Sequence, residues 1–219
     1  MTSPAPEPGG LNVSISRDYN FVWFRVAKTG TRSLHHLLEA EIDDYRYWTR
    51  WDPLYPELTD LLENGCFRFS IVRNPWDRLV SAWRNKIARG SVGKAKYLKR
   101  LSDTASENEV DAAKSDFVEF VRLLPGSSLL RNIHFRPQAE ILSGIELDFV
   151  GRFECYGDEI AHVLNEVGLG RLASAIPHRN RTYEGLHYSE YYNHESRDFV
   201  GDMFQADIAR WDYSFETVN

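Results

Sequence analysis

The stretch "FVWFRVAKTGTRSLHHLLEA", residues 21–40, joins an aromatic, apolar run to a leucine-rich run through the five residues "KTGTR". The first run predicts a buried strand, and the spacing of the leucines predicts a helix over residues 31–40. The turn between them, called here the KTGTR turn (residues 28–32), lies where a helix leaves backbone N–H groups without partners. A lysine, a glycine and two threonines at such a point favour an anion site.

The same order of strand and helix occurs twice more along the chain. "CFRFSIV" (66–72) predicts a strand, and "PWDRLVSAWRNKIA" (75–88) predicts a helix with Pro75 in its first turn. "LDFVGRFECY" (147–156) predicts a third buried strand, and "DEIAHVLNEVGLG" (158–170) the helix after it. We therefore expect an α/β fold with a central parallel sheet flanked by helices.

The length of 219 residues suits one sizeable domain. The hydrophobic fraction of 42% and the aromatic fraction of 13% are typical of a globular protein. Because the first ten residues are rich in Pro, Gly and Ser, we expect a flexible tail over residues 1–18 and one domain over residues 19–219. The formal net charge of -6 argues against a general nucleic-acid binder, which needs a basic face.

The cysteines and histidines predict neither a disulfide framework nor a metal site. Only Cys66 and Cys155 are present, too few for a four-thiolate zinc site. His35 and His36 are adjacent, so they point about 100° apart on a helix and cannot chelate as a pair. The start of the sequence lacks a signal peptide, and nowhere do eighteen apolar residues run together. We expect a cytosolic protein without a transmembrane segment.

The KTGTR turn has the residue types of a phosphate site. Gly30 permits a tight turn and close approach of the backbone to an anion, and Lys28 adds a mobile positive charge. It is not a Walker A loop, because Lys28 precedes the only glycine. Read alone, the five residues fit a plain turn equally well.

The second predicted strand ends in a similar way. Arg73 follows it directly, and Ser81 lies eight residues later, about two turns along the next helix. An arginine can hold a phosphate through two hydrogen bonds, and a serine hydroxyl can bind another oxygen. For Arg73 alone, a surface salt bridge is the alternative. Together with the KTGTR turn, however, these residues suit a ligand with two separated phosphate groups.

"FRVAKTGTRSL" and "IVRNPWDRLVSAWRNKI" resemble the 5′-phosphosulfate and 3′-phosphate segments of sulfotransferases that use 3′-phosphoadenosine 5′-phosphosulfate. The second segment is similar to the carbohydrate sulfotransferases of the chondroitin, dermatan and HNK-1 type. "NIHFRPQAEIL", "LDFVGRFECYGDE" and the aromatic end of the chain extend the resemblance over residues 20–215. It implies a P-loop-like sulfotransferase fold. The chain departs from these relatives at Ala27, where a proline is common, and at Arg32, where a small or hydroxylated residue is common.

The resemblance implies a role for each matching residue. Lys28 would lie beside the oxygen that bridges phosphate and sulfate, and Arg73 and Ser81 would hold the 3′-phosphate. The 5′-phosphate would be wrapped by Thr29, Gly30, Thr31, Arg32 and Ser33. The product would be adenosine 3′,5′-bisphosphate, and no metal is required.

A general base must remove the proton of the acceptor hydroxyl, and histidine titrates near the operating pH. We favour His134, because "NIHFRPQ" matches a histidine-aromatic motif of the resembled family; a structural hydrogen-bonding role is the alternative. His36, on the helix after the KTGTR turn, is the second candidate. His35 is expected in packing or at the surface, and Glu39 and Glu41 are further candidates.

Arg136, Arg152 and Arg181 are candidates for binding the acceptor, although each can instead pair with a carboxylate. Residues 84–100 carry seven Lys or Arg and no acid, and residues 102–119 carry six acids. These segments are either two solvated surfaces or, for the first, a basic lip that attracts an anionic acceptor.

We therefore expect sulfuryl transfer by in-line displacement to a hydroxyl, on a carbohydrate. The alternatives are a sulfotransferase for a small lipid or secondary metabolite, and a non-catalytic module that binds nucleotide or glycan. The sequence does not indicate an oligomeric state.

Overall fold

The computed structural model describes residues 11–49, 56–88, 94–176 and 186–217. The chain forms two compact units. The first comprises Met1–Arg73 and Ile141–Thr182, and the second comprises Asn74–Glu140 and Tyr183–Asn219. The KTGTR turn and Arg73 belong to the first unit, and His134 and Ser81 belong to the second.

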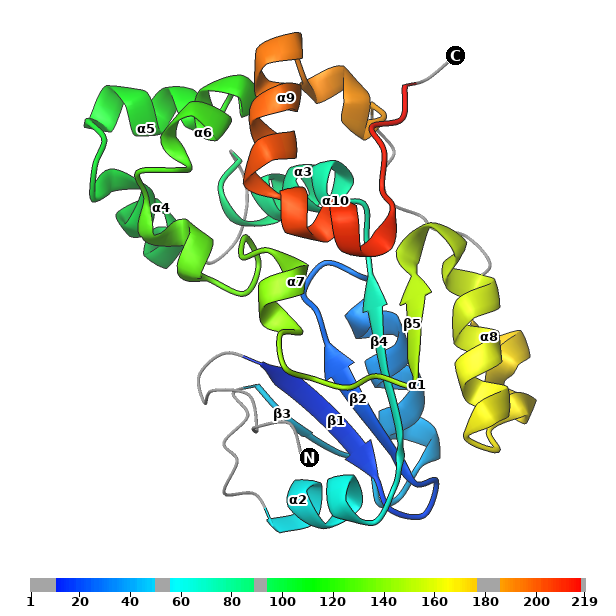
Figure 1. Ribbon diagram of the computed structural model, residues 1–219. Coiled ribbons are helices and arrows are strands. Elements are labelled where there is room, and N and C mark those ends of the chain that lie inside the picture. Colours follow the sequence, from blue (N-terminus) through cyan, green and yellow to red (C-terminus); the bar gives the residue numbers. More distant parts are fainter. Residues whose placement is uncertain (1–10, 50–55, 89–93, 177–185, 218–219) are drawn as a thin grey trace. The chain divides into compact units, whose positions relative to one another are not determined.

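The first unit is built on a five-stranded sheet in the order β3-β1-β2-β4-β5 (Figure 1). The strands are β1 (Asn12–Ser16), β2 (Phe21–Arg25), β3 (Arg46–Trp48), β4 (Phe67–Val72) and β5 (Phe149–Arg152). β2, β4 and β5 run parallel, whereas β1 is antiparallel to both of its neighbours. The predicted α/β class and its parallel strands are confirmed. The antiparallel edge formed by β1 and β3 was not predicted.

The prediction of a flexible tail over residues 1–18 is wrong from residue 12 onward. Residues 12–16, "NVSIS", form β1, which pairs along its whole length with β2. Val13 is 0% exposed and Ile15 is 2% exposed. The alternation of apolar and polar residues is a strand signal, which the neighbouring Pro and Gly residues obscure. Ser14 and Ser16 are buried as well, each 0% exposed. The first ten residues lie outside the described part of the chain.

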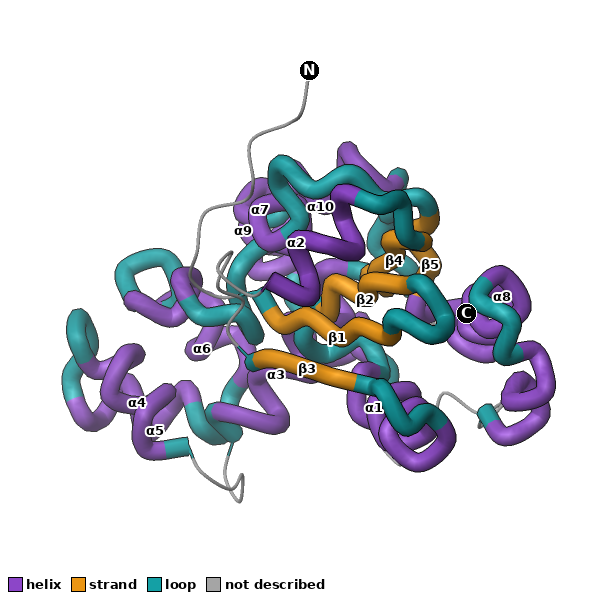
Figure 2. Tube along the Cα trace, turned by 90° about the horizontal axis from the view of Figure 1, so that it is seen from below, coloured by secondary structure: helices purple, strands orange, loops and turns teal. Residues whose placement is uncertain are grey.

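Helices cover both faces of this sheet. Figure 2 shows α1 and α2 on opposite faces. The helices of the unit are α1 (Thr31–Glu41), α2 (Pro56–Glu63) and α8 (Tyr156–Glu166), with 3₁₀ turns at Phe153–Cys155 and Gly170–Ala175. Leu34 and Leu38 of α1 pack with Trp23 and Phe69, whose rings stack at 5.8 Å. This packing fixes the start of α1 against the carboxyl end of β2.

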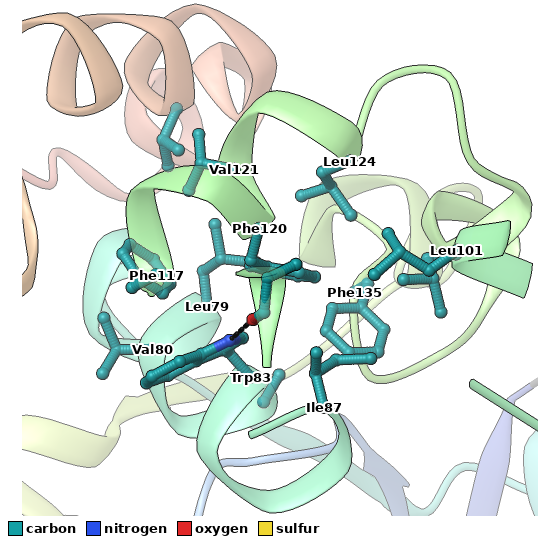
Figure 3. Close-up of a cluster of buried hydrophobic side chains, with 14 of the residues drawn as sticks. Leu79, Val80, Trp83, Ile87, Leu101, Phe117, Phe120, Val121, Leu124 and Phe135 are labelled. Atoms are coloured by element: carbon teal, nitrogen blue, oxygen red, sulfur yellow. Dashed lines mark hydrogen bonds between the residues drawn. The ribbon is translucent and has the colours of Figure 1, made fainter. Parts of the chain in front are cut away.

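The second unit is helical within the described residues. Its helices are α3 (Pro75–Lys86), α4 (Ala95–Ser102), α5 (Glu107–Ala113), α6 (Phe117–Leu123), α7 (Gln138–Ile141), α9 (His194–Met203) and α10 (Gln205–Trp211), with 3₁₀ turns at Ser128–Arg131 and Tyr188–Tyr191. Leu79, Phe120 and Phe135 lie in one buried cluster (Figure 3). Trp83 joins this cluster and donates from its indole nitrogen to the carbonyl oxygen of Ala113, at 2.8 Å.

Candidate functional site

The KTGTR turn contains two residues in the left-handed backbone conformation. Lys28 and Gly30 both have φ of 75°. Glycine adopts this conformation freely, but for a residue with a side chain it costs roughly 1–2 kcal/mol. A cost of this kind persists only where the surrounding structure fixes the backbone, and such positions cluster at functional sites. The backbone conformation of Lys28, as well as its charge, therefore indicates a functional position.

Gly30 is required by space as well as by conformation. A Cβ atom at this position would lie 2.5 Å from the ring of Tyr156 and 3.0 Å from the ring of Phe153. The Tyr156 hydroxyl donates a hydrogen bond to the carbonyl oxygen of Gly30, at 2.9 Å. Burial raises the pKa of Tyr156 well above its ordinary value, so the phenol stays a donor. The start of α8 thereby holds the start of α1.

The N-terminus of α1 lacks the groups that usually satisfy a helix end. Its N-cap residue is Gly30, which has no side chain to accept a hydrogen bond, and its first turn carries no acid. The helix after β4 differs, because the Asn74 side chain accepts from the main-chain N–H groups of Trp76 and Asp77. A helix N-terminus without a side-chain cap, together with the helix dipole, favours an anion at the start of α1. The start of α1 thus fits the predicted anion site, whereas the Asn74 side chain already caps α3.

Arg73 fixes the KTGTR turn from the end of β4. Its Nη1 donates to the carbonyl oxygen of Lys28 at 3.0 Å, and its guanidinium lies 4.3 Å from the centre of the Phe153 ring. Arg73 is 1% exposed. The structure thus brings together Lys28 and Arg73, which the sequence assigns to two different phosphates.

The other predicted ligands in this turn have different surroundings. Thr29 is buried and its hydroxyl donates to the carbonyl oxygen of Val26, at 2.9 Å. The main-chain N–H of Ser33 donates to the carbonyl oxygen of Gly30, at 3.1 Å. Thr31 is partly exposed, and Arg32 and Ser33 are exposed. The Thr29 hydroxyl therefore stabilises the turn itself, and Arg32 has the freest side chain for an incoming anion.

Ser81 lies on α3 in the second unit and is 3% exposed. It falls within the regular part of the helix, as the sequence predicts. Because Arg73 and Ser81 belong to different units, their joint binding of a phosphate stays a prediction.

A buried cation that the sequence reading missed lies three residues before Lys28. Arg25 is 7% exposed and donates from Nη2 to the carbonyl oxygens of Val13 (3.3 Å) and Trp48 (3.0 Å). Among the described residues no carboxylate pairs with it. Burial lowers its pKa from the ordinary value. Its position at the end of an otherwise apolar strand was the available signal, and its charge adds to the positive potential beside the turn.

His36, the second candidate base, and its neighbour His35 have contrasting environments. His36 is exposed over 66% of its side chain, with Nδ1 at 3.8 Å from Glu39. His35 is 15% exposed, and its Nδ1 lies 3.0 Å from the Tyr45 hydroxyl, which donates to the Ser14 hydroxyl at 2.7 Å. Burial lowers the pKa of His35. His35 thus holds together α1 and the antiparallel edge of the sheet, in line with the packing role expected for it.

His134 lies in the second unit between a 3₁₀ turn and α7. It is partly buried, and its ring contacts Tyr97 edge-on with centres 5.9 Å apart. Lys86 and Lys96 lie over the same tyrosine ring, at 5.3 and 5.1 Å. The favoured base therefore neighbours part of the basic segment 84–100.

The surroundings of the described residues that are predicted to bind the acceptor do not indicate a binding role. Arg136 pairs with Glu140 at 3.3 Å, one helical turn away, so the alternative role foreseen for it is present. Arg152 ends β5 and is exposed, and its main-chain N–H donates to Glu159. Arg181 lies outside the described residues. The described parts of the chain contain no cluster of His, Cys, Asp or Glu that could hold a metal ion. Within those same parts, no helix is long and apolar enough to span a bilayer.

Comparisons with known proteins agree with these features. A profile of the family described as "Sulfotransferase family" matches residues 12–214. Carbohydrate sulfotransferase 14 of Danio rerio is 30% identical over 180 residues, which cover 76% of this chain and 49% of that protein. No solved structure matches.

Two further relatives come from Xenopus laevis. Carbohydrate sulfotransferase 12 is 25% identical over 67% of this chain and 39% of its own length. Carbohydrate sulfotransferase 10 is 25% identical over 70% of this chain and 49% of its own length. The chain thus matches half or less of the length of each relative. Since the family profile covers nearly all of it, the chain belongs to the sulfotransferase family.

Proposed function

We propose that this chain transfers a sulfuryl group from 3′-phosphoadenosine 5′-phosphosulfate to a hydroxyl of a carbohydrate. The observation that carries the proposal is the start of α1. There an uncapped helix N-terminus, without an acid in its first turn, follows a lysine in the left-handed conformation. Membership of the sulfotransferase family supports this assignment.

The residues present fit the donor nucleotide. The main-chain N–H groups at the start of α1 would hold the 5′-phosphate, with the Arg32 side chain beside them. Arg73 and Ser81 are proposed to hold the 3′-phosphate, although Arg73 also binds the carbonyl oxygen of Lys28. Substituting Gly30 would push a side chain into Tyr156 and Phe153, so the narrow turn is specific to glycine.

The chemistry needs charge stabilisation and one proton transfer. When bound, the nucleotide supplies the sulfuryl group and leaves as adenosine 3′,5′-bisphosphate. Lys28 would neutralise the negative charge that grows on the phosphate oxygen as the bond from that oxygen to sulfur breaks. His134 would accept the proton of the acceptor hydroxyl as its oxygen bonds to sulfur. Charged groups that the protein holds beside the reacting atoms stabilise the transition state with little reorganisation.

The acceptor class comes from the names of the relatives, which are carbohydrate sulfotransferases. Lys86 and Lys96 near Tyr97, the ring that His134 contacts, support the basic lip as part of the acceptor site. Arg136, Arg152 and Arg181 stay proposals for the same role. The cytosolic setting also stays a prediction, which fractionation of cells that express the full-length protein would check.

Calorimetry with adenosine 3′,5′-bisphosphate tests the donor site. We expect saturable binding that is weakened in Arg73→Met, with Arg122→Met as control, because Arg122 forms an exposed ion pair with Glu119 on α6. No heat of binding at high micromolar ligand would refute the donor assignment. A radiolabelled-sulfate screen over glycans, lipids and phenols then separates the carbohydrate acceptor from the lipid or metabolite alternative. Nucleotide binding without any transfer would favour the non-catalytic module.

A further inference from the structure

The segment that carries His134 is held by a buried arginine of α3. Arg78 donates from Nη1 to the carbonyl oxygen of Arg136 and from Nη2 to that of Ile133, both at 2.9 Å. Arg78 is 1% exposed. One guanidinium therefore fixes the main chain on both sides of His134.

A buried carboxylate of α10 holds the end of the same segment. Asp207 is 0% exposed and accepts from the main-chain N–H groups of Gln138 (2.9 Å) and Ala139 (2.7 Å). The side-chain amide of Gln138 also donates to it, at 3.2 Å. Burial is the main cause that raises the pKa of Asp207, and these hydrogen bonds and the charge of Arg78 oppose the shift.

Burying the charged side chains of Arg78 and Asp207 costs free energy, because both charges lose their solvation. Apolar side chains of similar volume often give equal or greater stability than a buried ion pair. They could not, however, fix four named main-chain groups between Ile133 and Ala139. The pair of charges sets the position of the backbone, which packing alone would leave less defined.

Side-chain contacts complete the arrangement around the histidine. Phe135 is 0% exposed within the helical core, and the ring of His134 lies edge-on against Tyr97. With the residues before and after it fixed, the His134 ring has few positions open to it. A proton acceptor must be held within hydrogen-bond reach of its target. Restricting the His134 ring to few positions would keep it within that reach.

We infer that Arg78 and Asp207 are positioning residues for His134, an inference that rests on the proposed role of His134 as the general base. They act through the main chain of residues 133–139 and need no contact with the substrates. They serve to keep the imidazole in the orientation from which it takes a proton.

The test uses Asp207→Asn, which keeps the size of the side chain but replaces one accepting oxygen by a donor. The first readout is the NMR resonance of the His134 imidazole, assigned by its loss in His134→Gln. We expect it to move in Asp207→Asn while the resonance of His36, in the other unit, stays in place. The second readout is kinetic: kcat should fall about 10- to 100-fold, with KM and the Kd for adenosine 3′,5′-bisphosphate changed less than about twofold. Glu119→Gln, an exposed acid of the same unit, is the control and should change neither readout.

A folded Asp207→Asn with an unmoved His134 resonance and an unchanged kcat would overturn the inference. If this variant does not fold, Arg78→Lys decides by the same two readouts, because lysine keeps the charge but cannot bridge the two carbonyl oxygens. Loss of folding in both variants would show a purely structural role and also overturn it. Failure of the base role of His134 is seen separately, as full turnover in His134→Ala, and failure of the proposed function as wild-type protein that binds no bisphosphate. The resonance of His134 reports on its position in either case.

Discussion

Arg73 at the end of β4 donates a hydrogen bond to the main-chain carbonyl oxygen of Lys28, which lies 45 residues earlier, at 3.0 Å. The bond joins the two residues that the sequence assigns to opposite ends of the donor nucleotide. It also helps to hold Lys28 in a left-handed conformation that a lysine does not adopt readily. Arg73 therefore has a structural task in addition to its proposed binding task.

We predict that Arg73→Lys weakens the binding of adenosine 3′,5′-bisphosphate about 10- to 100-fold. Lysine keeps the charge, but it lacks the planar fork that can bind an anion and the Lys28 carbonyl oxygen together. The lost charge-assisted hydrogen bond corresponds to about 1.5–3 kcal/mol. Calorimetry measures the change, with Arg122→Lys as control. Equal affinities in Arg73→Lys and the wild type would remove Arg73 from the site.

We predict that Gly30→Ala destabilises the protein more than Gly65→Ala does. Both glycines have a left-handed φ, 75° and 78°, so alanine costs roughly 1–2 kcal/mol at either position. Only at Gly30 would the new Cβ also meet Tyr156 and Phe153, whereas nothing lies within 4 Å at Gly65. Overpacking of this kind typically adds about 1–3 kcal/mol. Urea unfolding of the two variants measures the difference in the free energy of unfolding. Equal losses of stability would show that Tyr156 and Phe153 move aside without cost.

We predict that Lys28→Ala and Lys28→Gly lose turnover alike but differ in stability. Both remove the charge that is proposed to neutralise the leaving phosphate, so kcat should fall far more than nucleotide affinity does. Glycine relieves the left-handed conformation, so Lys28→Gly should be more stable than Lys28→Ala by about 1 kcal/mol. Single-turnover kinetics and denaturant unfolding check the two parts. Equal, small losses of turnover and affinity would favour the non-catalytic module.

We predict that Tyr45 makes the protein less stable in alkali. Burial raises the pKa of Tyr45 to about 12, from an ordinary value of 10.0. The folded state therefore keeps its proton when the unfolded state has lost it. The contribution of Tyr45 is fully present below pH 10 and is lost as the pH rises through 12, by about 3 kcal/mol in total.

The check is the free energy of unfolding as a function of pH in the wild type and in Tyr45→Phe. Phenylalanine cannot ionise, so the variant should lose less stability than the wild type between pH 10 and 12. From pH 7 to 9 the two curves should run parallel, which serves as the internal control. Parallel curves throughout the alkaline range would show that the Tyr45 hydroxyl is not protected from ionisation.

Local pattern predicts the strand, turn and helix of residues 21–40, because apolar spacing and the single glycine act within a few residues. The sequence likewise places Arg73 at the end of a strand. It could not show that Tyr156 binds the Gly30 carbonyl oxygen from 126 residues away, since that contact depends on how α8 packs on the sheet. β1 was missed because five residues beside a Pro-rich segment carry too weak a signal, and pairing with β2 decides their structure.

The buried polar residues were the least predictable part of the site. Arg25 ends an apolar strand, a position that marks the residue but does not show which carbonyl oxygens it binds. Asp207 is the single acid within α10, and nothing beside it in the sequence indicates burial. Their roles follow from main-chain groups that distant segments bring within reach. Sequence spacing carries no information about such contacts.

The central claim is tested most directly by the transfer of radiolabelled sulfate from 3′-phosphoadenosine 5′-phosphosulfate to a panel of glycans, lipids and phenols. The proposed function predicts label in a glycan with the wild-type protein and, at saturating donor, almost none with Lys28→Ala. Absence of label in every acceptor class, from protein that binds adenosine 3′,5′-bisphosphate, would contradict it.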